Sequence, residues 1–362
     1  MLIMSMNLPE TIALILGFLA LLPTIASLTR FDQWWIRGFD FPRLQISSFI
    51  LIVIIYSGVV FDFSSFWEYV IMFLLVFSFL YQGVKIYPYT FFAKKQVHKF
   101  KGKDDPNEIS ILVSNVLATN NNYGKLITLI VQKNPDLVLT LESNDDWEKN
   151  LEIIEKQYPY TVKIPQENLY GMHLYSKLEL EDIDIKYLMS EEIPSIHGKV
   201  NLRSGKKVNI HCLHPKPPSP SEDTTSTNRD AELLMVGKEI EGQRATLVFG
   251  DLNDVAWSRT TDLFISLSGL LDPRIGRGFF NTFHAQYPVF RWPLDHVFHS
   301  DDFLLDNLKR LDDIGSDHFP IFIKLVYDPE DDDLNNSPKD PDQEERDWAD
   351  EKIEDGKTNN HN

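Results

Sequence analysis

Cysteine and basic residues are scarce in this chain, and both shortages exclude classes of protein. Cys212 is the one cysteine in 362 residues, so an intrachain disulfide cannot form and a zinc site built from cysteines is excluded. Lysine and arginine number 35 against 53 aspartates and glutamates, which gives a formal net charge of −18 at pH 7. Because non-specific nucleic-acid binding requires basic side chains that neutralise phosphates, this balance argues against that class and favours metal binding.

The acidic excess is greatest near the C-terminus, where apolar residues are also few. Residues 328–362 contain 14 acidic and 4 basic side chains and therefore carry −10 of the net charge. A segment with so little apolar surface and so much like charge does not build a core. We expect 328–362 to be an acidic disordered tail.

Long polar stretches are missing from residues 1–98, which contain three apolar runs at about 11–28, 44–61 and 67–84. Each run has roughly 18 residues, close to the length of a helix that crosses the core of a bilayer. Aromatic residues gather at the ends of the runs, as they do at membrane interfaces, among them Trp34, Trp35, Trp67, Tyr87 and Tyr89. No lysine or arginine precedes the first run, so we do not expect a cleaved signal peptide. The pattern predicts a membrane region at 1–98 with three transmembrane helices.

The basic residues near these runs indicate an orientation. Arg30, Arg37 and Arg43 lie between the first and second runs, and six lysines between 85 and 103 follow the third run. Positive residues concentrate on the cytoplasmic side of membrane proteins. This predicts a cytoplasmic domain after the third run, and the small counts leave an extracytoplasmic domain open as the alternative.

From residue 108 onward, short apolar strands alternate with helical segments, and strands predominate later. Strands are expected at 109–116, 136–140 and 245–249, and helices at 123–132, 145–158 and 228–241. Elements that alternate in this way form layered folds in which helices cover the sheets. The prediction for 99–327 is an α/β domain built as a layered sandwich.

Polar side chains stand at the strand ends or loop starts of this domain. The set is Asn115, Glu142, His214, Asp251 with Asn253, Asp295, and Asp317 with His318. Each member alone has a structural interpretation as a turn, cap or surface residue. Together they are typical of a site for a hard cation with an acid–base pair, although spacing alone does not show that they converge.

A cation and a reactive water can be assigned from these residue types. Glu142 and Asp317 offer carboxylate oxygens, the ligands that suit Mg²⁺ or Mn²⁺. Asp251 follows an apolar strand and a glycine, so its carboxylate would lie just outside a sheet. There it would orient or deprotonate a water.

The remaining members would handle protons and developing charge. His318 would contact phosphoryl oxygens or carry a proton, and a carboxylate such as Asp295 would orient it. Asn253 and Asn115 would donate hydrogen bonds to charge that develops during a reaction.

These residues occur in the order of a known family's motifs. The pieces are Ser114-Asn115-Val116, Leu141-Glu142-Ser143, His214, Gly250-Asp251-Leu252-Asn253, Pro293-Leu294-Asp295-His296 and Gly315-Ser316-Asp317-His318. In this order they resemble the endonuclease/exonuclease/phosphatase superfamily, over about 108–327. The resemblance implies a four-layered α/β sandwich, two packed β-sheets flanked by helices. It also implies cleavage of phosphoester bonds with a divalent metal, usually Mg²⁺.

The resemblance carries roles onto individual residues. Glu142 and Asp317 look like metal ligands, and Asn115 matches an amide beside the metal. Asp251 resembles the residue that positions or activates the water, and Asn253 resembles its partner at the transition state.

Histidine roles follow in the same way. Asp295 resembles the carboxylate that pairs with a catalytic histidine, here His318. His214 resembles the histidine that hydrogen-bonds the phosphate, with His211 as a competitor; we prefer His214 because it stands beside a proline-rich loop. Lys177 departs from the family by standing where an arginine is usual.

The three apolar runs ahead of the domain resemble those of a membrane-anchored bacterial branch of the family. The resemblance implies a bacterial cytoplasmic (inner) membrane location and, for some members, lipid-linked phosphates as substrates. Arg229 and Arg291 are then candidate contacts to a substrate phosphate.

We therefore predict an integral membrane, metal-dependent phosphoesterase. It would hydrolyse a phosphodiester, phosphomonoester or pyrophosphate bond, with a lipid-linked substrate as the favoured class. A metal-dependent endonuclease or exonuclease acting on nucleic acid is the alternative enzyme. A catalytically inactive membrane scaffold that recruits partners through its acidic tail is the alternative outside enzymes, and the intact set of polar residues argues against it.

Overall fold

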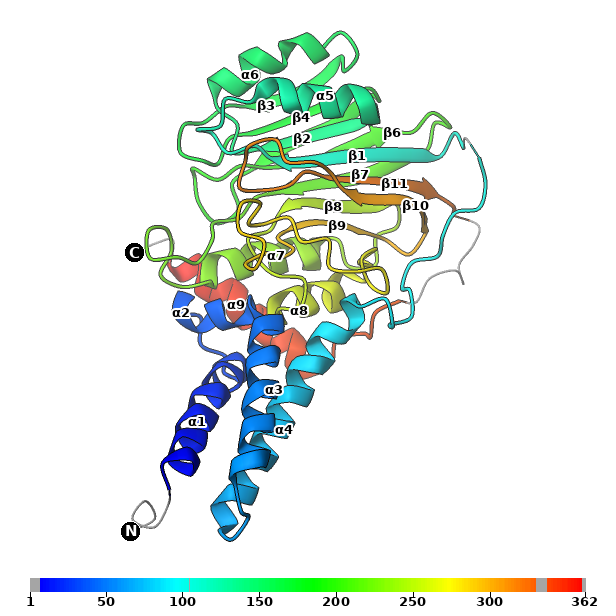
Figure 1. Ribbon diagram of the computed structural model, residues 1–362. Coiled ribbons are helices and arrows are strands. Elements are labelled where there is room, and N and C mark those ends of the chain that lie inside the picture. Colours follow the sequence, from blue (N-terminus) through cyan, green and yellow to red (C-terminus); the bar gives the residue numbers. More distant parts are fainter. Residues whose placement is uncertain (1–6, 104, 330–336, 360–362) are drawn as a thin grey trace. The chain divides into compact units, whose positions relative to one another are not determined.

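The computed structural model describes residues 7–103, 105–329 and 337–359, and it divides into two compact units (Figure 1). One unit comprises the chain up to Ala93 together with Pro218–Ser226. The other comprises Lys94–Pro217 and the chain from Thr227 onward. The first unit therefore includes a short segment taken from the middle of the second unit's sequence.

Helices α1 (Leu8–Leu28), α3 (Arg43–Val60) and α4 (Phe66–Ile86) make up most of the first unit. Among the described residues, three segments are long and apolar enough to cross a membrane: Leu8–Leu28, Arg43–Val60 and Phe66–Tyr89. The expectation of three such helices is confirmed. Short turns lie between and after them: α2 (Trp34–Arg37), η1 (Gly38–Asp40) and η2 (Tyr87–Tyr89).

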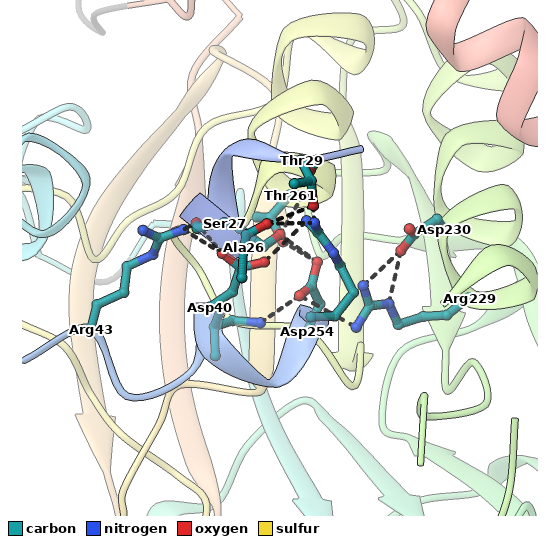
Figure 2. Close-up of polar contacts among 12 residues, drawn as sticks. Ala26, Ser27, Thr29, Asp40, Arg43, Arg229, Asp230, Asp254 and Thr261 are labelled. Carbon is teal, nitrogen blue, oxygen red and sulfur yellow. Dashed lines mark hydrogen bonds and ion pairs between the residues drawn. The ribbon is translucent and has the colours of Figure 1, made fainter. Parts of the chain in front are cut away.

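Buried polar side chains join the three long helices near one end of this unit. Arg43, at the start of α3, donates from Nη1 to Oε1 of Gln82 in α4 at 2.9 Å and from Nη2 to Oγ of Ser27 in α1 at 2.7 Å. Arg43 also pairs with Asp40 at 2.5 Å (Figure 2). The amide of Gln82 in turn donates to Oγ1 of Thr24 at 3.0 Å. Because these groups are buried, each depends on its partners to offset the cost of lost hydration.

The second unit contains two mixed β-sheets within the described residues. The first has the order β10-β11-β1-β2-β4-β3, with bounds β1 (Glu108–Asn115), β2 (Leu137–Leu141), β3 (Tyr160–Ile164), β4 (Met172–Ser176), β10 (Phe303–Arg310) and β11 (Ile321–Tyr327). The second has the order β5-β6-β7-β8-β9, with bounds β5 (Leu180–Lys186), β6 (Ser195–Asn201), β7 (Lys207–Leu213), β8 (Thr246–Asp251) and β9 (Asp295–His299). The central pairs β1–β2 and β7–β8 are parallel.

The core lies between the two sheets because alternate residues of each strand point to opposite faces. Ile109 and Ile111 of β1 share a buried cluster with Val208 and Ile210 of β7. The other strand faces pack against helices, as Leu112 does in β1.

Helices cover the outer face of each sheet, which completes four layers (Figure 1). Helices α5 (Tyr123–Lys133) and α6 (Asp145–Leu151), followed by η3 (Glu152–Ile154), bring Leu126 and Trp147 onto the first sheet. Helices α7 (Thr227–Glu239) and α8 (Arg259–Ser268) bring Leu233 and Phe264 onto the second. The predicted four-layered α/β sandwich is confirmed.

The prediction of a disordered tail is wrong for part of the C-terminal segment. Residues Gln343–Asn359 form helix α9, in which Trp348 and Ala349 are buried against Leu234 and Leu263. Gly356 permits a close approach to α7, because a Cβ at this position would lie 2.4 Å from Cβ of Ala231. The prediction rests on the average composition of the segment. A helix can nevertheless pack on an existing surface through a few small and apolar residues. The rest of the predicted tail includes 330–336 and 360–362, which lie outside the described residues.

We expect Trp348→Ala to lower the free energy of unfolding of the second unit by about 3 kcal/mol, because it empties a buried aromatic site. Amide hydrogen exchange along α9 should accelerate in the same variant. Glu351→Ala, at an exposed position of the same helix, is the matched control and should alter neither quantity. Equal exchange in both variants would show that Trp348 does not hold α9 in place.

Candidate active site

The predicted polar residues meet where central strands of the two sheets end. Asn115 ends β1 beside Leu141 of the parallel strand β2, and Glu142 follows directly. In the other sheet, Asp251 ends β8 and is the register partner of Asp295, which begins the antiparallel strand β9. Parallel strands end at one sheet edge and an antiparallel neighbour begins there, so the topology gathers these side chains.

The side-chain amide of Asn115 bridges the two sheets. Its Nδ2 donates to Oε1 of Glu142 at 2.7 Å and to Oδ2 of Asp251 at 3.1 Å. Its Oδ1 accepts the backbone N–H of Leu117 at 3.1 Å, which fixes the amide with its NH₂ toward the carboxylates. One buried amide therefore holds two carboxylates that come from different sheets.

Glu142 retains one unfilled carboxylate oxygen. Its Oε2 is buried and has no hydrogen-bond partner among the described residues. Burial raises the pKa of Glu142 to about 7; the hydrogen bond from Asn115 opposes this rise, and the Asp317 carboxylate adds to it. Glu142 also has a φ of 55°, in the left-handed region that non-glycine residues seldom adopt. A buried bare oxygen beside further carboxylates is a donor set that fits a divalent cation.

His318 and Asp295 form a buried ion pair. Nδ1 of His318 lies 2.8 Å from Oδ2 of Asp295, and Nε2 lies 3.5 Å from Oδ2 of Asp251. Burial lowers the pKa of His318, but the carboxylates of Asp295 and Asp251 outweigh it and raise the pKa to about 10. Burial likewise raises the pKa of Asp251, and the His318 charge opposes that rise. The ring is therefore an imidazolium at neutral pH.

Asp251, Asp295 and His318 also lie close enough to hold a cation, with one ligand atom of each within 4.8 Å of the others. His318 already pairs with both carboxylates of this cluster, at 2.8 Å from Asp295 and 3.5 Å from Asp251, so a cation there would compete with the ring. Glu142 and Asp317 carry no such conflict, because both offer only oxygen ligands. Asp317 is partly exposed, and Ser316 Oγ donates to its Oδ1 at 3.3 Å.

His214, and not His211, reaches this site. Nε2 of His214 lies 4.0 Å from Oδ2 of Asp251, and burial lowers the pKa of His214 to about 4, so the ring is neutral. His211 instead faces His197, with their Nδ1 atoms 2.7 Å apart. The preference for His214 therefore agrees with its position, while its role stays a prediction.

Asn253 lies beside Asp251 and is bonded on several sides. Its backbone N–H donates to Oδ1 of Asp251 at 3.0 Å, and its Nδ2 donates to the carbonyl oxygen of Pro215 at 2.9 Å. Its own carbonyl accepts Nη1 of Arg229 at 2.8 Å. These bonds hold Asn253 at a φ of 50°.

Arg229 does not have the position expected for a substrate contact. Only 2% of the residue is exposed, and its guanidinium pairs with Asp230 at 2.7 Å and with Asp254 at 3.4 Å (Figure 2). A buried guanidinium with these partners supports the loop behind Asp251, and it is not the solvent-facing side chain that a substrate contact would use. Sequence alone does not distinguish a solvated arginine from one enclosed by acidic neighbours.

Arg291 remains a candidate for contact with substrate. It is partly exposed, packs on the ring of Phe319 at 4.9 Å and donates to the carbonyl of Ala285 at 2.7 Å. The N–H of Ala285 donates to the carbonyl of Asp317 at 2.7 Å, which places Arg291 close to the site along the backbone.

Two site residues escape prediction from the sequence. Oγ1 of Thr282 accepts the backbone N–H of Asp295 at 3.2 Å, and the ring of Phe283 lies 4.9 Å from the ring of His318. Both belong to the loop that precedes β9 and support the His318–Asp295 pair from behind. No motif marks them, because a threonine and a phenylalanine in a loop are ordinary residues.

Comparison with known proteins agrees with this fold. The family model described as the endonuclease/exonuclease/phosphatase family matches residues 112–318. A structure of D. rerio TDP2 with a single-strand DNA product has a TM-score of 0.50 at 18% identity and covers 60% of this chain and 98% of that chain. The human Nocturnin catalytic domain with bound sulfate has 0.50 at 15%, covering 61% and 94%. An endonuclease/exonuclease/phosphatase from Beutenbergia cavernae DSM 12333 has 0.50 at 16%, covering 61% and 72%. A search of curated protein sequences gives no match.

We expect Asp295→Asn to lower the pKa of His318 well below 10, because the variant keeps the hydrogen-bond shape and removes the adjacent charge. In the unchanged chain the folded state holds this proton between about pH 6.5 and 10, where the unfolded state has lost it. The stabilisation is therefore full below pH 6.5 and declines as the pH rises through 10, and the decline should shrink in the variant. Titration of the His318 ring by NMR measures the shift. Asp312→Asn, at an exposed position, is the control, and an equal pKa in both variants would contradict the pairing.

Proposed function

The chain belongs to the endonuclease/exonuclease/phosphatase family, and from that premise we propose that it is a membrane-anchored phosphoesterase that requires a divalent metal. The observation that carries this proposal is the bridge from Asn115 to Glu142 and Asp251. Through this bridge, Glu142, whose Oε2 has no hydrogen-bond partner among the described residues, lies near the buried carboxylate of Asp251. The protonated ring of His318 lies 3.5 Å from the same carboxylate. Such a grouping suits the attack of water on a phosphate better than it suits a structural core.

Glu142 and Asp317 would hold the cation, with Mg²⁺ favoured over Mn²⁺ as the occupant. Both residues offer hard oxygen ligands, and burial of Glu142 makes its anionic form depend on a nearby positive charge. When bound, the cation would polarise a phosphoryl oxygen and offset negative charge on it. Asn115 would keep Glu142 in position through its amide hydrogen bond.

The chain's own residues would manage the water and the protons. Asp251 would orient the water and accept its proton, since its carboxylate lies between two donors and stands at the strand end. The His318 imidazolium, oriented by Asp295, would donate a hydrogen bond to a phosphoryl oxygen as charge develops. His214, neutral and buried, would contact another oxygen of the same phosphate. Asn253 would be the partner of Asp251 at the transition state.

The substrate we favour is a lipid-linked phosphate. The three apolar helices would keep the enzyme at a membrane, and the net charge of −18 disfavours a polyanion such as DNA or RNA. Nucleic acid hydrolysis is therefore an outcome that the substrate test must distinguish. The resemblance to a membrane-anchored bacterial branch of the family favours a bacterial cytoplasmic membrane. The distribution of basic residues around the helices favours a catalytic domain on the cytoplasmic side.

In the full chain, we expect Asp251→Asn and His318→Ala each to reduce hydrolysis by at least about a hundredfold, because each removes a proton-handling group. The assay compares polyprenyl pyrophosphate, phosphoinositides, sphingomyelin, plasmid DNA and RNA, with Mg²⁺ and with EDTA. Asp312→Asn should retain full activity as the exposed control. Hydrolysis that proceeds equally in EDTA would refute the metal requirement, and unchanged turnover in either site variant would refute the site.

Orientation can be tested separately with reporters fused after Lys103. We expect a fluorescent protein at this position to fluoresce and alkaline phosphatase to stay inactive, since the former matures in the cytoplasm and the latter outside it. The opposite pair of results would place the catalytic unit outside the membrane and leave the chemistry of the site unaffected.

A further inference from the structure

A short segment between β7 and α7 belongs to the unit that contains the three long helices. Residues Pro218–Ser226, called the strap below, follow His214 in the chain yet belong to the compact unit of the long helices. The N–H of Trp34 donates to the carbonyl of Thr224 at 3.0 Å, and the N–H of Ser226 donates to the carbonyl of Asp32 at 2.8 Å. Between these bonds, Gln33 and Thr225 pair as an antiparallel bridge. The strap is therefore held by backbone hydrogen bonds, as a β-strand is.

The loop that receives the strap is itself fixed by buried charge. It runs from residue 29 to residue 42, between α1 and α3. Arg37 donates to the carbonyl of Thr29 at 2.8 Å and pairs with Asp40 at 3.2 Å, and Asp40 also pairs with Arg43. Charges removed from water keep their partners tightly, because an unpaired buried charge is costly. This network joins the loop to all three long helices.

Both flanks of the strap hold the same active-site residue. Pro215, three residues before the strap, accepts Nδ2 of Asn253 at 2.9 Å. Arg229, three residues after it, donates to the carbonyl of Asn253 at 2.8 Å and is locked by Asp230. Asn253 also has a left-handed φ of 50°, a region that asparagine enters more readily than most residues.

We propose that the strap positions Asn253 from the three-helix unit, so that the helices set the geometry of the catalytic site as well as anchoring the chain. The path runs from Arg43 and Asp40 to the 29–42 loop, along the strap, and into the two flanks that hold Asn253. Asn253 in turn donates its N–H to Asp251. The inference rests on the proposed function for its effect on turnover, whereas the mechanical link itself can be tested without it.

The sharpest test removes one hydrogen bond that holds the strap and leaves the site untouched. Trp34 is the first residue of α2, a position that tolerates proline because its N–H has no partner within the helix. Trp34→Pro therefore removes the donor to Thr224. Trp34→Ala loses the same side chain and keeps the N–H, which makes it the matched control.

In the full chain, we expect kcat of Trp34→Pro to fall about tenfold with KM within about twofold, because small displacements of a positioned group reduce the rate more than binding. Trp34→Ala should keep the activity of the unchanged chain. Amide hydrogen exchange at Ser226 and at Asn253 should accelerate in Trp34→Pro alone. The exchange measurement needs no substrate, so it judges the link even if hydrolysis is never observed and the proposed function fails.

A second variant removes the link at a different point. Four residues of Gly-Ser sequence inserted between Pro217 and Pro218 leave the strap on the helices but uncouple Pro215 from it. We expect the same loss of kcat and the same faster exchange at Asn253 in this variant. Unchanged exchange at Asn253 and unchanged kcat in both Trp34→Pro and the insertion variant would overturn the proposal. A loss of kcat with Asn253 exchange unaltered would also overturn it, since the effect would then bypass Asn253.

Discussion

The hydrogen bonds from one amide, that of Asn115, hold the site together. Glu142 and Asp251 stand at the ends of strands in different sheets, and their carboxylates would repel each other in a buried setting. The amide satisfies an oxygen of each and fixes their separation. Ser316 adds to this by donating to the carbonyl of Asn115 at 2.9 Å, which joins the segment that carries Asp317 and His318 to the end of β1. The same hydrogen bonds therefore join the two sheets and fix the geometry of the site.

The site has two parts with opposite electrostatic character. Around His318 the carboxylates stabilise a proton, and its pKa rises to about 10. Around Glu142 burial and Asp317 destabilise the anion, and its pKa rises to about 7. The first part supplies its own positive charge, whereas the second needs one from outside the chain. This division places a cation beside Glu142 more naturally than within the Asp251, Asp295 and His318 cluster.

Local patterns predicted much of the fold and of the site, and their failures share a cause. The three apolar helices and the strand ends carrying Asp251 and Asp295 follow from periodicity and strand punctuation, which depend on neighbours in sequence. Arg229 and α9 were misjudged because their burial depends on partners far along the chain. Thr282 and Phe283 were missed for the same reason, since only the fold brings them behind Asp295 and His318.

The sequence by itself determined which chemical groups are present, the family they resemble, and the existence of three helices long and apolar enough to cross a membrane. Tertiary structure alone decided that His214 approaches Asp251 while His211 turns to His197. It also decided that Arg229 supports Asn253 instead of facing solvent, and that Pro218–Ser226 joins the helical unit. The physical reason is that hydropathy and strand patterns are properties of adjacent residues. Burial, ion pairing and strand register depend on distances between residues that only the folded chain brings near.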